Sequence, residues 1–167
     1  DAIFCSSTCL DEAISRYHVP LCGVPFMEIL DWYLSKCTDV ASLMILTIVK
    51  VFAEAKQNGI TPVEVDCVKD LCVHNSPVEF IDPAGMKVYE NILSMLQIEN
   101  GNPSYEFWHY VAVHQRVGAN AFANGTIESG AGSALAGFFA NANHHCVEFN
   151  AAVADRVEIL KDIEKGG

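Results

Sequence analysis

The stretch VASLMILTIVKVFA, from Val40 to Ala53, places apolar side chains on nearly every face of a helix. Lys50 interrupts it, and the run falls short of the roughly 18 apolar residues that a membrane span requires. A helix that is apolar on all sides is typical of the centre of a helical bundle. The sequence therefore predicts a buried central helix over 39–58 and no membrane span.

The prolines extend this interpretation to the rest of the chain. Pro is tolerated at the first turn of a helix, where no backbone hydrogen bond is lost, but it disrupts a central strand. Asn58-Gly59 and Asn100-Gly101 resemble helix stops. No pair of strands with a hairpin turn is predicted. Capping side chains precede proline in the motifs TPVE, SPVE, DPAG and NPSYE, at Pro62, Pro77, Pro83 and Pro103.

These signals predict an all-α fold, a disulfide-stabilised helical bundle of about six to eight helices in a single domain over 1–167. The chain of 167 residues is long enough to bury a core of its own. The expected helices cover 8–18, 25–36, 39–58, 62–74, 83–98, 103–123, 127–141 and 143–164.

The charge balance excludes some partners. Lysine and arginine number 10 against 21 aspartates and glutamates, giving a formal net charge of -11. Phosphate backbones and anionic membranes attract basic surfaces, so nucleic acid is not expected as a partner. Hydrophobic residues make up 51% of the chain and charged residues 19%. A large ordinary core explains this excess. An internal ligand cavity or a buried interface, including one between copies of the chain, explains it too.

Seven cysteines are present, six of them in the disulfide-rich part at 1–75. They form no paired CxxC motifs, so a zinc ribbon is not supported. Such clustering is typical of disulfides in secreted proteins, and the sequon at Asn124 agrees as a glycosylation site. The chain opens at Asp1. A mature chain whose signal peptide was removed would begin in this way, and so would a trimmed chain. Connectivity stays open, as does whether Cys146 is free. The disulfide candidates are Cys5, Cys9, Cys22, Cys37, Cys67 and Cys72.

Two histidine–glutamate pairs raise the question of a metal site. Glu106 and His109 have the i, i+3 spacing of one helical face, and His145 and Glu148 repeat it in reverse order. A metal needs several converging ligands, and spacing alone shows no convergence. His145 beside Cys146 points about 100° away from it on a helix and so is a poor base for a thiol nucleophile. We therefore expect no catalytic residue, metal or cofactor. A metal-dependent enzyme remains a third alternative.

The segment SGAGSALAGFFANA, from Ser129 to Ala142, predicts a close-packed helix that its glycines weaken. With the aromatic helix before it, this helix is expected to line an apolar pocket. The first hypothesis is therefore a secreted, non-enzymatic binding protein that holds a small apolar ligand between helices. The second is a secreted effector-type or surface protein that acts by protein–protein interaction. The expected ligand-binding residues are Phe107, Trp108, Tyr110, Gly137, Phe138 and Phe139.

Overall fold

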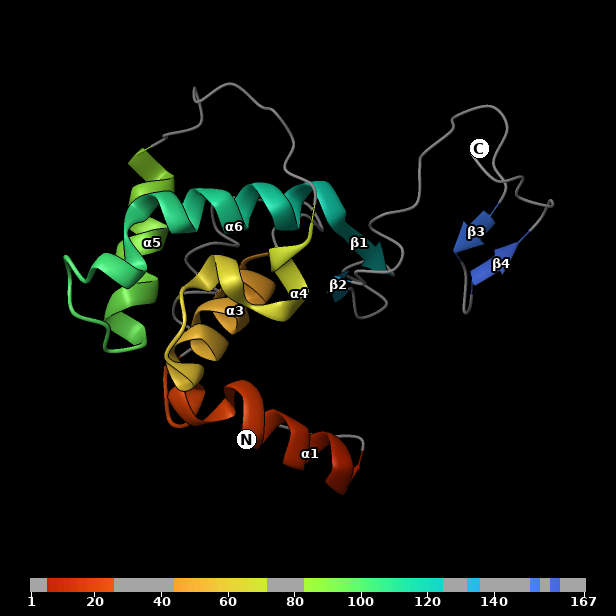
Figure 1. The fold of residues 1–167 in the computed structure, drawn as a ribbon, viewed down its shortest axis with the longest axis horizontal. Helices are drawn as coiled ribbons and strands as arrows, with labels where there is room; N and C mark the ends of the chain where they lie inside the picture. Colours follow the sequence, from red (N-terminus) through yellow and green to blue (C-terminus); the bar gives the residue numbers. More distant parts are fainter. Residues whose placement is uncertain are drawn as a thin grey trace.

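The computed structural model describes residues 6–25, 44–71, 83–124, 132–135, 151–153 and 157–159. Most of them are helical (Figure 1), which confirms the helical character that the sequence predicts. None of these helices combines the length and the apolar character needed to cross a membrane. The helical elements are α1 (Ser7–Ala13), η1 (Ile14–His18), η2 (Val19–Leu21), α3 (Met44–Asn58), η4 (Pro62–Glu64), α4 (Asp66–Lys69), α5 (Pro83–Met95), η6 (Pro103–Tyr105) and α6 (Phe107–Asn120).

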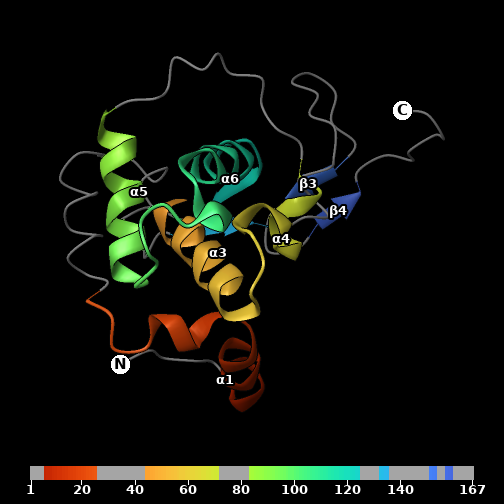
Figure 2. The same cartoon turned by 60° about the vertical axis from the view of Figure 1, so that its left-hand side comes forward.

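Helix α3 is the centre of the fold, as the sequence predicts. Its side chains are buried on several faces, and Ile48 and Phe52 are at most 1% exposed. Helix α6 packs against α3, and the segments η1, η2 and η4 contact it as well. Figure 2 shows α3 between α5, α6 and the N-terminal segment. The apolar surface of this helix is thus covered from several directions, which is what its all-round apolar sequence requires.

The N-terminal helix begins with a side-chain cap and changes from an α-helix to a π-helical turn at its end. The Ser6 hydroxyl accepts a hydrogen bond from the Cys9 amide at 3.1 Å, which satisfies one of the free N–H groups at the start of α1. The predicted helix over 8–18 is confirmed, but its last five residues, Ile14–His18, form a π-helical turn. A 3₁₀ turn containing Pro20 follows and ends the helical run. π-Helical turns are rare and commonly mark a local functional or packing requirement.

The capping box after α3 forms, but the long helix expected behind it does not. The backbone N–H of Thr61 donates to Glu64 Oε2 at 2.8 Å. The helix predicted over 62–74 is nonetheless split into η4 and the short α4. Val65 between them is extended, with φ −61° and ψ 132°, and this backbone interrupts the helical hydrogen bonds. Residues 72–74 of the prediction lie outside the described part.

Helices α5 and α6 are both shorter than predicted. Helix α5 begins at Pro83, as the DPAG motif indicates, and ends at Met95 instead of residue 98. Helix α6 begins at Phe107 instead of 103, because Glu106 is extended (ψ 158°) and separates it from η6. It ends at Asn120 instead of 123, and an extended segment follows it. The Asn102 side chain accepts from the Ser104 amide at 2.9 Å, so the NPSYE cap closes the short η6 turn only.

Two strand pairs correct the remaining helix predictions. Strand β1 (Ala121–Asn124) pairs antiparallel with β2 (Gly132–Leu135), and β3 (Ala151–Val153) pairs antiparallel with β4 (Val157–Ile159). The helices expected over 127–141 and 143–164 are therefore wrong at these residues, and so is the expectation of no strand pair. Glycine weakens a helix, and β-branched residues in 151–159 suit a strand as well as a helix, so pairing overrides the periodicity. The helix over 25–36 lies outside the described residues beyond Pro25.

Candidate functional site

The aromatic residues predicted to bind a ligand do not share one environment. The rings of Phe107 and Tyr110 stack with centroids 5.8 Å apart, and the Tyr89 ring meets Phe107 edge-on at 5.3 Å. Tyr110 is buried in the core, whereas Trp108 on the neighbouring face is 53% exposed. Phe107 and Tyr110 thus pack against each other, and Trp108 faces outward. The other three expected residues, Gly137, Phe138 and Phe139, lie outside the described part.

The side chains of Glu106 and His109, predicted as a possible half of a metal site, lie in different environments. The Glu106 carboxylate accepts a hydrogen bond from Trp108 Nε1 at 2.8 Å on the surface, while His109 is only 2% exposed. Burial lowers the pKa of His109 from its usual value. Its Nδ1 has no hydrogen-bond partner within the described residues. Those residues contain no group of three metal-ligating side chains, and His145 and Glu148 lie outside them.

The cysteines that the structure describes lie in three different settings. Cys22 is exposed and Cys67 half-buried, and neither is bridged to another cysteine of the described residues. Burial raises the pKa of the Cys67 thiol, and the nearby Glu54 carboxylate raises it further. Cys9 lies half-buried on α1. No expected disulfide is therefore seen among them, and Asn124 of the sequon ends β1. Four cysteines lie outside the described residues: Cys5, Cys37, Cys72 and Cys146.

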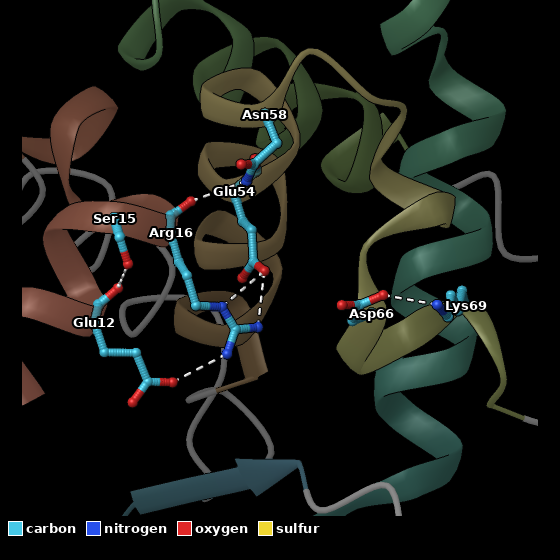
Figure 3. Close-up of polar contacts among 7 residues, drawn as sticks. All are labelled: Glu12, Ser15, Arg16, Glu54, Asn58, Asp66 and Lys69. Atoms are coloured by element: carbon cyan, nitrogen blue, oxygen red, sulfur yellow. Dashed lines mark hydrogen bonds and ion pairs between the residues drawn. The ribbon is translucent and has the colours of Figure 1, made fainter.

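A polar cluster joins the π-helical turn to α3 (Figure 3). Arg16 donates from Nε and Nη2 to Glu54 Oε1, at 3.2 and 2.8 Å, and from Nη1 to Glu12 Oε1 at 3.1 Å. Glu54 is only 6% exposed, so its charge is largely removed from water. The hydrogen bond and charge of Glu54 raise the pKa of Arg16. Glu54 is thus a buried carboxylate whose charge is neutralised by one arginine.

Side chains of α3 also donate hydrogen bonds to backbone carbonyls of η1. Gln57 Nε2 donates to the Ile14 carbonyl at 2.7 Å, and Asn58 Nδ2 donates to the Arg16 carbonyl at 3.1 Å. The ammonium of Lys50 lies 4.4 Å from the centre of the Tyr17 ring, a cation–π contact. These contacts all hold the N-terminal helix on α3. The cluster is therefore an attachment point between two segments of the chain.

A pocket of about 340 Å³ lies where the ends of α3 and α5 meet η6. Lys56, Gly59 and Ile60 at the end of α3 form one side of it. The segment from Gln97 to Tyr105 supplies the rest. Ile60 and Ile98 give it apolar surface, and the other side chains around it carry hydrogen-bonding groups.

The two helices end beside the pocket in the same way. The Ile60 amide donates to the Ala55 carbonyl at 3.1 Å, after Gly59 with φ +67°. The Ile98 amide donates to the Leu93 carbonyl at 2.8 Å, after Gln97 with φ +51°. Both arrangements are Schellman motifs, in which a left-handed residue closes the helix. The pocket therefore lies at two helix C-termini, where the carbonyl ends of the helix dipoles carry partial negative charge.

Gln97 stands where such a motif favours glycine. A left-handed backbone costs an L-residue with a Cβ on the order of 1 kcal/mol. Strain of this kind is commonly retained where the side chain has a use. Here Gln97 is one of the residues that line the pocket.

Hydrogen bonds fix the walls of the pocket. The Tyr105 hydroxyl donates to the Ile60 carbonyl at 3.3 Å, and the Tyr89 hydroxyl donates to the Tyr105 carbonyl at 2.6 Å. The ammonium of Lys56 donates to the Leu96 carbonyl at the end of α5. The end of α3, the end of α5 and η6 are thus tied to one another. A site held in this way changes little on binding, which reduces the entropy cost of taking up a ligand.

No protein-family model, curated protein or solved structure matches this chain.

Proposed function

We propose that this chain is a secreted, non-enzymatic binding protein that holds a small ligand between helices, in the pocket at the ends of α3 and α5. The observation that carries this proposal is the left-handed Gln97 on the pocket wall. The volume of about 340 Å³ is within the range of small-molecule sites. Ile60 and Ile98 suit the apolar part of a ligand, and the polar groups around them suit a head group. The ligand is therefore small and amphipathic.

Filling the pocket tests this proposal. Ser104 lines the pocket, whereas Ser94 is exposed on α5 outside it, so Ser104→Trp and Ser94→Trp form a matched pair. A library of small polar and amphipathic fragments, screened by saturation-transfer NMR, is expected to give binders to the natural chain and to Ser94→Trp. Ser104→Trp is expected to lose those signals, because the indole occupies the space. If no fragment binds the natural chain, or if Ser104→Trp binds the same fragments, the pocket is not the site.

The proposal includes secretion and a bundle of six to eight helices stabilised by disulfides. It is supported by the clustering of six cysteines in the first 75 residues and by the sequon at Asn124. Protein isolated from an oxidising compartment is expected to gain about 6 Da in intact mass on reduction, the mass of three opened bridges. An unchanged mass would show that the chain is fully reduced, Cys22 and Cys67 included.

Recognition of another protein is a second candidate function, favoured by the surface of the N-terminal helix. Leu10, Ile14 and Val19 are 37%, 44% and 61% exposed. Leu10 and Ile14 are four residues apart and therefore share one face. Exposed apolar side chains grouped on one element are common at protein interfaces. The fragment screen separates the two functions, because a chain that only binds proteins at this face needs no small-molecule pocket.

A further inference from the structure

We infer that the pocket at the ends of α3 and α5 selects a ligand with a positively charged nitrogen, a small organic ammonium ion. This inference rests on the proposed function, since it names the chemistry of the ligand in the same pocket. It is independent of the aromatic site expected from the sequence. The evidence is the electrostatic field of the pocket, the group that already occupies part of it, and the side chain at Gln97.

The field of the pocket favours a cation. A helix C-terminus carries roughly half a negative charge, and α3 and α5 both end here. The Schellman bonds occupy the Ala55, Leu93 and Ser94 carbonyls, and the carbonyls after them in each last turn are the ones available to a further donor. Glu99, a further lining residue, adds a full negative charge. Within the part of the chain that the structure describes, Lys56 is the only cationic side chain that lines the pocket, and Glu99 and the two helix termini together outweigh it.

Lys56 shows what kind of group the helix ends accept. Its ammonium crosses from α3 to the Leu96 carbonyl at the end of α5. A primary ammonium is therefore already bound by a carbonyl at this helix terminus within the protein itself. A ligand ammonium has the same donors and can reach the carbonyls of the other terminus and the Glu99 carboxylate. A ligand carboxylate is attracted by Lys56 and can accept from the neutral donors of Gln97, Asn102 and Ser104, but Glu99 and the two helix termini repel it.

Gln97 supplies an acceptor that glycine would lack. Its amide oxygen can accept a hydrogen bond from an ammonium, and its position in the Schellman motif places the residue on the wall. Gln97→Gly removes this acceptor and relieves the left-handed strain. The expected result is weaker binding in a fold that is at least as stable, a combination that loss of structure cannot produce.

The test compares three probes of one shape: butylammonium, 1-butanol and butyrate. Each is titrated into the full chain at low salt and followed by two-dimensional NMR. Butylammonium is expected to bind at least several-fold more tightly than the other two, and to weaken as salt is added. Glu99→Gln is expected to weaken it by about threefold and Lys56→Met to strengthen it by about threefold, through loss of an attracting and a competing charge respectively.

The sign of the Lys56→Met effect decides the class of ligand. Tighter butylammonium binding supports the inference. If the natural chain binds butyrate more tightly than butylammonium, and Lys56→Met loses that binding, the ligand of the pocket is an anion. That result would overturn this inference but leave the proposed binding function standing. Preference for 1-butanol would likewise overturn it and leave the pocket as the site. If neither these probes nor the fragment library binds in a way that Ser104→Trp abolishes, the proposed function fails as well.

Discussion

The variant Ile48→Asp is expected to be unfolded under conditions in which the natural chain is folded. Ile48 lies in the second turn of α3 and is 1% exposed. An aspartate there places an unpaired carboxylate in the core, at a cost of several kcal/mol. Domains of this size have a total stability of about 5–15 kcal/mol, so one such change removes most of it. Far-UV circular dichroism and thermal melting measure the outcome.

Two controls separate burial from chemistry. Ile14→Asp makes the same substitution on η1, where the side chain is 44% exposed, and is expected to change stability by about 1 kcal/mol or less. Ile48→Val keeps an apolar side chain at the core position and is expected to cost about 1 kcal/mol. If Ile48→Asp melted like the natural chain, α3 would face water or a partner, and the arrangement around it would be wrong.

The variant Arg16→Met is expected to destabilise the chain by about 2 kcal/mol, between the values for surface and buried ion pairs. The side chain of Glu54 is 7% exposed and that of Arg16 41% exposed, so only the carboxylate is deeply buried. Removing the guanidinium leaves that carboxylate without its cation, while methionine keeps the apolar stem. Urea denaturation gives the change in the free energy of unfolding.

The surface ion pair between Lys69 and Asp66 on α4 is the matched control (Figure 3). Lys69 Nζ lies 2.7 Å from Asp66 Oδ1, a similar distance, but both side chains are exposed. Lys69→Met is therefore expected to cost less than about 0.5 kcal/mol. Adding Glu54→Gln to Arg16→Met is expected to recover part of the loss, because it removes the buried charge. Additive effects of the two changes would mean that Arg16 and Glu54 do not act as a pair.

The sequence patterns that predicted the fold correctly were local ones, each with a single physical explanation. A helix with the all-round apolar pattern of 44–53 is stable only at the centre of the fold, and the Thr61–Glu64 cap is satisfied within four residues. Helix α5 begins at Pro83, where the DPAG motif predicts a start. The strands had no such signal. Their residues also fit a helical pattern, and only pairing with the next extended segment of the chain favours the extended form.

Breaks inside helical runs were missed for a different reason. Val65 and Glu106 are extended, although neither is a residue type that disfavours helix strongly. Their conformation is set by the short 3₁₀ turns before them and by the packing of η4 against α6. No propensity at a single position contains that information.

The pocket and the buried ion pair both depend on contacts between segments far apart in the sequence. Gln97 at φ +51° is not predictable from its type, since glycine or asparagine is the usual residue there. Arg16 and Glu54 are 38 residues apart. One signal was available: Glu54 lies within the apolar run VFAEA, where a charge on a buried helix requires a partner.

The central claim, that the pocket at the ends of α3 and α5 is the binding site for a small cation, is tested most directly by mapping the amide shifts of the chain during a butylammonium titration. We expect saturable shifts at Gly59, Gln97, Glu99 and Ser104, with butyrate saturating the same amides at concentrations at least several-fold higher. Shifts confined to Trp108 or to the face of Leu10 and Ile14, or no saturable shift anywhere, would contradict it.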